Sequence, residues 1–238
     1  MTYYDAHCHL HEFTDSRIEG FRDFIIAAVS DDYPSSRRTL ELSERFGNVV
    51  PCVGIHPWVV GKVGFDELRA LEGFLDRVGC IGEVGLDRRF VPETFERQLE
   101  FFRVFVGWAR DYGLVLNVHA PDAWRDVFDV VRRVDVDVVV FHWFTGPLDL
   151  VEEIVGVGYY VSVNAAVKVQ EKSRLVAKVV PLDRLLLESD GPYEYRGITL
   201  EPPMVVEAAE LVARIKGLGV DDLWGRVRDN FVRVFGVG

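Results

Sequence analysis

Eight apolar runs rich in β-branched residues recur along the 238-residue chain, and segments with helical periodicity separate them. Such runs are typical of parallel strands that are buried on both faces because helices cover them. The strands are predicted over residues 3–9, 24–29, 49–55, 80–84, 114–119, 138–142, 159–163 and 185–189. The helices are predicted over residues 34–46, 65–77, 92–111, 122–134, 148–155, 167–179, 203–216 and 221–235, with only a short helix between the first two strands.

Strict alternation of eight strands with helices predicts an α/β fold, in which a single (β/α)8 TIM barrel spans residues 1–238. No repeat, low-complexity tract or Ser/Gly-rich linker marks a domain boundary. The main alternative is a doubly wound open sheet, which would carry a glycine-rich phosphate loop after an early strand. This sequence has no such loop, so the barrel is favoured.

The formal net charge of −11 argues against a broad basic surface for duplex nucleic acid, but not against a small substrate or a nucleic-acid end. No apolar run approaches the ~20 residues of a membrane helix. Acidic Asp5 follows soon after Met1, so we expect no signal peptide, no membrane partner and a cytoplasmic protein.

The three cysteines lie in apolar runs and are predicted to be reduced, buried thiols. Scarce Asn, Gln and Met beside abundant Val and Arg indicate a thermophilic source.

Six side chains that can bind a divalent metal fall at the carboxyl ends of predicted strands, where barrels carry their functional residues. They are His7 and His9 after the first strand, Glu83 after the fourth, His119 after the fifth, His142 after the sixth and Asp190 after the eighth. Each alone is more often an ordinary buried residue, but one placement rule met six times favours a metal centre. Four imidazoles and two carboxylates suit two divalent ions, with centrally placed Glu83 as the bridge. Imidazole ligands favour Zn, Mn, Fe or Co over Mg.

These motifs resemble those of the TatD family of metal-dependent deoxyribonucleases, within the amidohydrolase-like barrels. They run in the family's order as Asp-Ala-His-Cys-His-Leu (5–10), Gly-Ile-His-Pro (54–57), Gly-Glu-Val-Gly-Leu-Asp (82–87), Val-His (118–119), His-Trp-Phe-Thr-Gly (142–146) and Leu-Glu-Ser-Asp-Gly-Pro-Tyr (187–193). The resemblance implies that one metal ion is held by His7, His9 and Asp190. It implies a second ion on His119 and His142, with Glu83 between the two. Members are often assayed with Mg, so Mg joins Zn, Mn and Co as a candidate.

The substrate contacts of the family are only partly present. Family members commonly carry an arginine soon after the strand-5 histidine, whereas this chain reads His119-Ala120-Pro121-Asp122. The Lys and Asn expected beyond Arg196-Gly197 are also replaced. DNA is therefore expected as ends or short single-stranded segments. The alternative is a metallohydrolase of a small ester, amide or phosphoester, or of a charged-tRNA ester, without nuclease activity. A non-catalytic scaffold that kept its metals is a third hypothesis.

Further roles in catalysis, substrate binding and ligand orientation are predicted for individual residues. Asp190 is the predicted proton acceptor, and Glu83 is predicted to be catalytic beside it. Substrate contacts are predicted for His56, Arg196 and Arg88. Strand parity turns three polar residues inward, where they are predicted to orient the ligands: Glu188, Asn117 and Asp5. For Glu188 the alternative is pairing with a cation at the barrel floor. The aromatic residues Trp58, Trp143 and Phe144 near the barrel mouth stack on a base in one interpretation and pack under loops in the other.

Overall fold

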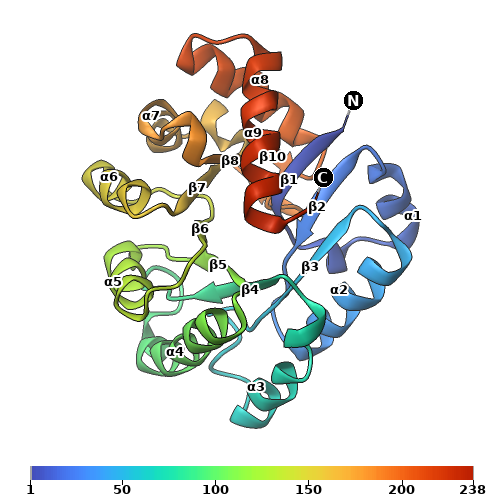
Figure 1. Ribbon diagram of the computed structural model, residues 1–238, viewed down its shortest axis with the longest axis vertical. Helices are drawn as coiled ribbons and strands as arrows, with labels where there is room; N and C mark the ends of the chain where they lie inside the picture. Colours follow the sequence, from blue (N-terminus) through green and yellow to red (C-terminus); the bar gives the residue numbers. More distant parts are fainter. Residues whose placement is uncertain (1, 238) are drawn as a thin grey trace. The chain divides into compact units, whose positions relative to one another are not determined.

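The computed structural model describes residues 2–237, so residues 1 and 238 of the predicted barrel span lie outside the described residues. Eight strands form one sheet, ordered β1 to β8 as in the sequence (Figure 1). They are β1 (Tyr3–Cys8), β2 (Phe24–Ala28), β3 (Val49–Val53), β4 (Cys80–Gly85), β5 (Val115–His119), β6 (Val139–Phe141), β7 (Tyr160–Val163) and β8 (Leu185–Leu187). β1 pairs with β2, β3 with β4, β4 with β5, β5 with β6 and β7 with β8, all in parallel. Each strand lies within two residues of its predicted position.

The chain divides into two compact units. The first unit joins Met1–Ala28 to His142–Gly238, and the second unit is Val29–Phe141. The first unit therefore holds β1, β2, β7 and β8, and the second holds β3 to β6. A single domain over the whole chain stays a prediction.

Helices occupy the predicted intervals with three local differences. They are α1 (Asp15–Ile18), α2 (Tyr33–Arg45), α3 (Phe65–Glu72), α4 (Phe95–Tyr112), α5 (Trp124–Val134), α6 (Leu148–Gly156), α7 (Glu171–Val179), α8 (Met204–Lys216) and α9 (Val220–Phe235). The helix between the first two strands is short, as predicted. The predicted helix 65–77 ends at Glu72, because the chain turns at Gly73 and resumes as a 3-10 turn. The predicted helices 92–111 and 167–179 likewise begin as 3-10 turns before α4 and α7.

A short antiparallel hairpin after β8 was not predicted from the sequence. It pairs β9 (Tyr193–Tyr195) with β10 (Ile198–Leu200). The two turn residues, Arg196 and Gly197, have φ of 48° and 79°, the left-handed values of a type I′ turn that matches the strand twist. Each strand has only three residues, so the alternation in Tyr-Glu-Tyr and Ile-Thr-Leu is too short to give the usual strand signal.

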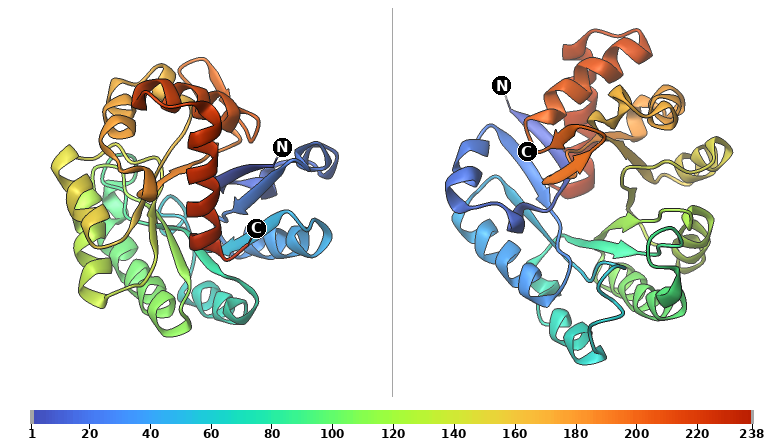
Figure 2. Two further views of the ribbon diagram at one scale, coloured as in Figure 1. Left: turned by 45° about the horizontal axis from the view of Figure 1, so that its top comes forward. Right: turned by 180° about the vertical axis from the view of Figure 1, so that it is seen from behind.

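In the first unit, helix α9 packs on β1 and β8 (Figure 2). The ring of Tyr4 on β1 lies 5.2 Å from that of Phe231, and the ring of Tyr3 lies 5.1 Å from Trp224. The side chain of Asn230 donates to the carbonyls of Leu182 and Leu185 at 2.7 and 2.8 Å, which ties α9 to the start of β8. Among residues 2–237, none of the helices combines the length and apolarity needed to cross a membrane.

In the second unit, the carboxyl ends of β4 and β5 approach each other closely at Gly85. Gly85 has φ of 151°, and a side chain there would collide with the carbonyl oxygen of His119. Glycine is therefore required on both conformational and steric grounds. The close approach brings Glu83 on β4 beside His119 on β5.

Candidate metal centre

Three ligand atoms of the first unit form a nearly equilateral triangle. The Nε2 atoms of His7 and His9 lie 3.4 Å apart. Asp190 Oδ1 lies 3.4 Å from the first of them and 3.6 Å from the second. Tetrahedral zinc with bonds of about 2.0–2.1 Å separates its ligand atoms by about 3.3 Å. The spacing of these three atoms therefore fits a divalent metal ion, as the sequence predicts.

Hydrogen bonds to the backbone hold β1 and the segment after β8, which carry these ligands, in place. Asp5 Oδ1 accepts the backbone N–H of Ser189 at 2.8 Å and that of His7 at 3.2 Å, and the N–H of Asp190 donates to the His7 carbonyl at 2.9 Å. Asp5 thus fixes the backbone that carries the ligands, and its predicted role in orienting the ligand side chains stays a prediction. Full burial raises the pKa of Asp5 to about 8.

Asp190 has a backbone that few side chains tolerate. Its φ is 55°, in the left-handed region where aspartate and asparagine are enriched among non-glycine residues. Burial acts to raise the pKa of Asp190, but the contact with His9 and the charges of His142 and His7 outweigh it and hold the pKa below its usual value. The carboxylate form that binds cations is therefore favoured.

His142 joins this group through ring stacking and through Glu188. Its ring lies parallel to that of His7, with centroids 3.9 Å apart. Glu188 Oε1 lies 3.6 Å from His142 Nδ1 and accepts the backbone N–H of Trp143 at 2.7 Å, while Oε2 accepts the Ser162 hydroxyl. Glu188 therefore lies near His142, and its role in orienting a histidine stays a prediction. Together, His7, His9, His142, Glu188 and Asp190 are called the His7 cluster below.

The second unit holds its own group, the His119 cluster of His56, Glu83, Asp87 and His119. His119 Nε2 lies 2.9 Å from Asp87 Oδ2, and Nδ1 lies 2.7 Å from Glu83 Oε1. Both carboxylates only accept hydrogen bonds, so a neutral His119 ring donates to one of them and a protonated ring donates to both. The tautomer with its proton on Nε2 donates to Asp87 and leaves Nδ1 as a possible metal ligand. His56, Glu83 and His119 each offer a ligand atom within 4.8 Å of the others, so this group is a second candidate metal site.

His56 is predicted to touch substrate and belongs to the same buried cluster. Its Nδ1 accepts the backbone N–H of Trp58 at 3.2 Å, so the neutral ring carries its proton on Nε2. Nε2 faces Glu83 Oε1 at 3.4 Å and His119 Nδ1 at 3.3 Å. Burial, more than any other cause, lowers the pKa of His56 and favours this neutral form. His56 is thus placed as a hydrogen-bond donor, and its contact with substrate stays a prediction.

Asp87 is the site residue that sequence reasoning missed. It is fully buried, and its Oδ2 accepts from Trp58 Nε1 at 2.6 Å as well as from His119. Its Oδ1 accepts the backbone N–H groups of Arg89 and Phe90, each at 2.7 Å. Burial acts to raise the pKa of Asp87, but these hydrogen bonds and His119 outweigh it and hold the pKa at about 2. The position of Asp87, an even number of residues after Glu83, was the available signal, because alternate residues of an extended chain point to the same side.

Arg88 and Arg196, the other two predicted substrate contacts, interact with neighbouring residues of the protein. The Arg88 guanidinium makes two hydrogen bonds with the Asp126 carboxylate, at 2.9 and 3.0 Å, and lies 3.6 Å above the ring centre of Phe95. Arg196 lies in the β9–β10 turn, with Nη1 at 3.3 Å from the Val169 carbonyl. Asn117 is fully buried on β5. The functional roles of these three residues stay predictions.

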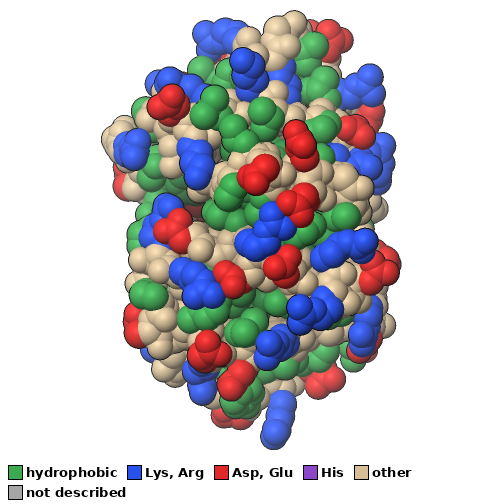
Figure 3. Space-filling model, turned by 90° about the vertical axis from the view of Figure 1, so that its left-hand side faces the viewer, with side chains coloured by type: hydrophobic (Ala, Val, Ile, Leu, Met, Phe, Trp, Pro, Cys, Tyr) green, Lys and Arg blue, Asp and Glu red, His purple; other side chains and the backbone are tan. Residues whose placement is uncertain are grey.

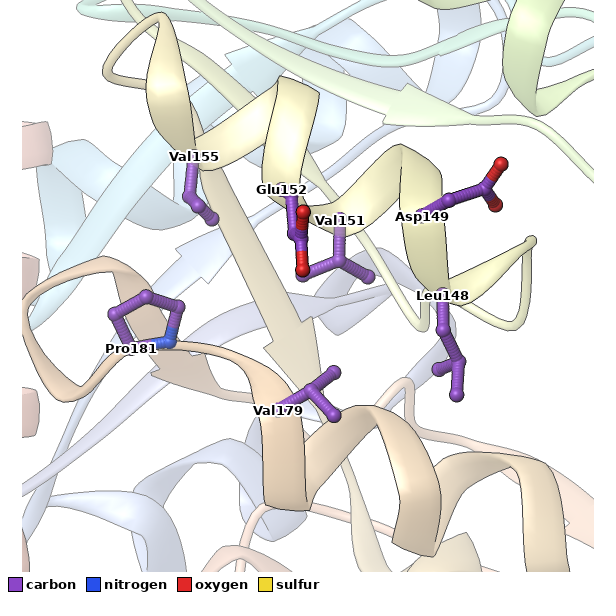
Figure 4. Close-up of a pocket in the computed structure, with 7 residues that line it drawn as sticks. All are labelled: Leu148, Asp149, Val151, Glu152, Val155, Val179 and Pro181. Atoms are coloured by element: carbon purple, nitrogen blue, oxygen red, sulfur yellow. The ribbon is translucent and has the colours of Figure 1, made fainter.

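The ligand groups belong to separate units, so the predicted bridge through Glu83 and the predicted pairing of His119 with His142 stay predictions. A pocket of about 330 Å³ in the first unit is of a different kind, because apolar side chains dominate it. Figure 4 shows the side chains of α6 that face Val179 and Pro181 across it. With Asp149 and Glu152 as its only acidic lining residues and no histidine, this pocket carries no metal-ligand set.

Comparison with known proteins identifies the chain's family. The family model described as "TatD related DNase" matches residues 4–236. An Escherichia coli protein named uncharacterized metal-dependent hydrolase YcfH is 32% identical, over 97% of this chain and 94% of its own length. Human deoxyribonuclease TATDN3 is 28% identical, over 97% of this chain and 93% of its own.

A solved structure shows the same fold. The crystal structure of YJJV, a TATD homolog from Escherichia coli, superposes with a TM-score of 0.90 at 24% identity, covering 99% of this chain and 98% of that one. The predicted α/β fold of (β/α)8 TIM-barrel class is thus confirmed, as is the family predicted from the ordered motifs. The chain belongs to the TatD family of metal-dependent hydrolases.

Proposed function

We propose that this protein hydrolyses phosphodiester bonds of DNA with the help of divalent metal ions. The observation that carries the proposal is the spacing of imidazole and carboxylate atoms in the His7 cluster and the His119 cluster, each at carboxyl ends of parallel strands. Family membership and the name of the human relative support DNA as the substrate. The test is cleavage of single- and double-stranded DNA by protein loaded with Zn, Mn, Co or Mg in turn.

The metal ions would be held by His7, His9 and Asp190 in the first unit and by His119 and Glu83 in the second. Such ions supply charge stabilisation for a phosphoryl group and a lowered pKa for water. The Asp190 carboxylate accepts the proton that the attacking water loses. His56 donates its Nε2 proton as a hydrogen bond to a phosphoryl oxygen. Asp87 keeps the ring of His119 oriented, so that Nδ1 stays available as a ligand.

The chain should bind about two divalent ions at saturation, one for each cluster. His119→Ala should lower this to about one, because it removes a ligand of the second unit and leaves the His7 cluster intact. Elemental analysis after equilibrium dialysis measures the ratio. Asp135→Asn is the control, since that side chain is 86% exposed and belongs to neither cluster. One ion per wild-type chain at saturation would exclude the two-ion proposal.

A second candidate function is hydrolysis of a small ester or amide, or of the ester of a charged tRNA. The observation that favours it is that two arginines near the His119 cluster are each paired with an aspartate. Arg88 is paired with Asp126, and Arg89 makes two hydrogen bonds with Asp122 at 2.9 and 2.7 Å, so neither presents an unneutralised charge to DNA. Activity of metal-loaded protein on small esters, with none on DNA, would decide for this candidate.

If DNA is the substrate, its binding should depend only weakly on salt. Basic and acidic side chains are interspersed on the face shown in Figure 3, and the net charge is −11. For single strands the slope of log K against log salt is about −0.7 per neutralised phosphate, so two to three contacts imply roughly −2. Oligonucleotide affinity for Asp190→Asn protein, measured over a salt series at fixed metal, gives the slope. A slope of about −5 or steeper would mean an extended cationic track.

A further inference from the structure

Two aromatic side chains stand exposed side by side at the edge of the His119 cluster. Trp58 is 41% exposed and Phe90 is 56% exposed. Their ring centres lie 5.5 Å apart with the rings inclined at 70°. Single exposed aromatic residues are common on protein surfaces. An adjacent exposed pair that borders a buried cluster of polar residues calls for a more specific explanation.

Both aromatic residues are fixed by the same buried carboxylate. Asp87 accepts the indole N–H of Trp58 on one oxygen and the backbone N–H of Phe90 on the other. The backbone N–H of Trp58 is held by His56. The one polar atom of the indole is therefore already satisfied, and the bonds to Asp87 hold the Trp58 ring and the Phe90 backbone in place, so the pair offers aromatic surface to solvent. A preorganised surface loses little conformational entropy when a ligand stacks on it.

The aromatic pair lies within reach of a substrate held at the His119 cluster. The indole centre is 6.1 Å from the ring centre of His119 and 5.1 Å from that of His56. These distances would bring the base of a nucleotide within reach of Trp58 if its phosphate lay at these histidines. We propose that Trp58 and Phe90 form a stacking subsite for a nucleobase next to the scissile phosphate. This inference rests on the proposed function and adds to it the recognition of an unpaired base.

The chemistry of the pair favours a base over other ligands. Stacking on aromatic rings is available to every base because each has a π face, so a subsite of this kind tolerates sequence changes. The guanidinium of Arg89 lies 6.0 Å from the ring centre of Phe90 and is paired with Asp122. The subsite therefore gains affinity from stacking, with little contribution from charge. Bases stacked inside a duplex cannot occupy it, which restricts it to single strands and frayed ends.

The test compares two short single-stranded oligonucleotides that differ only in whether the nucleotide at the cleaved position carries a base or is abasic. Metal-loaded wild type, Trp58→Ala, Trp58→Phe and Phe90→Ala are assayed for kcat and KM on both. Tyr112→Ala is the matched control, because that aromatic side chain is also 43% exposed but lies at the end of α4. Circular dichroism confirms that each variant is folded.

Stacking predicts that Trp58→Ala and Phe90→Ala raise KM for the base-bearing oligonucleotide about tenfold, while KM for the abasic one changes little. Trp58→Phe should retain most of the affinity, since it keeps a ring and loses only the bond to Asp87. Tyr112→Ala should resemble wild type. The inference is overturned if Trp58→Ala affects both oligonucleotides equally. It is also overturned if Trp58→Phe is as damaging as Trp58→Ala while Phe90→Ala has no effect, because Trp58 would then act only through Asp87.

The same experiment distinguishes failure of the proposed nuclease function from failure of the stacking subsite. If wild type leaves both oligonucleotides intact, nuclease activity is excluded, and fluorescence anisotropy with labelled copies of the same two molecules decides on the subsite. A preference for the base-bearing molecule that Trp58→Ala abolishes supports stacking. Equal affinity of wild type for the two molecules overturns it.

Discussion

Asp190→Asn should leave the fold intact and lower turnover on a phosphodiester substrate by roughly two to four orders of magnitude, the range for loss of a general base. The amide cannot take up a proton, and it replaces an anionic ligand that lies 3.4 Å from His7 Nε2 with a neutral one. Asparagine is the informative substitution because it also tolerates the left-handed backbone at this position. The measurement is kcat at saturating metal, with circular dichroism and thermal unfolding as checks on the fold.

The matched control for this experiment is Asp135→Asn. Asp135 also has a left-handed backbone, with φ of 63°, but its side chain is 86% exposed and pairs only loosely with Arg132 at 3.2 Å. The same chemical change in the same backbone conformation should therefore leave turnover unchanged. Activity of the Asp190→Asn protein within a few-fold of wild type would remove Asp190 from the proposed mechanism.

The second large effect is expected from Asp87→Asn. An amide has one oxygen and one NH2 group, so two of the four N–H donors that now point at the carboxylate would face another donor. Each buried donor left without an acceptor costs about 1–3 kcal/mol. Loss of the carboxylate behind His119 should also weaken metal binding by roughly 10–100-fold, as for other residues that orient a metal-binding histidine. Metal titration and thermal unfolding in chelator measure the two effects separately.

Asp122→Asn is the control for Asp87→Asn. Asp122 lies close to the same loop, where it pairs with Arg89, but its side chain is 54% exposed. An exposed ion pair contributes about 0–1 kcal/mol, so metal affinity and stability should change little. Unchanged metal affinity in Asp87→Asn would show that the hydrogen bond to His119 has no influence on a metal ion.

Much of the fold and of the ligand set follows from local rules. Buried parallel strands are continuous apolar runs, so the eight strands could be located from hydrophobicity alone. Strand parity then placed His7 and His9 together, and their Nε2 atoms lie 3.4 Å apart. The parity rule also turned Asp5 and Glu188 inward, and both are fully buried. These features depend on neighbours within a few residues, which a sequence displays directly.

What could not be predicted depends on contacts between distant residues. Asp87 and His119 are 32 positions apart, and Trp58 and Asp87 are 29 apart, so no periodicity links them. The proton position on His56 follows from one backbone hydrogen bond in a loop. The hairpin at Arg196 was not predicted because its strands have only three residues each, and because a type I′ turn is usually marked by Asn-Gly or Asp-Gly.

The way Asp87 holds the loop after β4 has a consequence for how this protein can change. It anchors Arg89 and Phe90 only through their backbone N–H groups, so the side chains at these two positions are not needed for the anchor. Most residues other than proline can supply the same two donors. Substitution at positions 89 and 90 can therefore alter which molecules are accepted while His119 keeps its orientation. A library randomised at these two positions should yield variants with shifted substrate preference and wild-type metal affinity. This loop is a suitable starting point for redesign. Backbone N–H groups hold Asp87 and so the geometry of His119, whereas the side chains at positions 89 and 90 lie beside and in the proposed subsite, respectively.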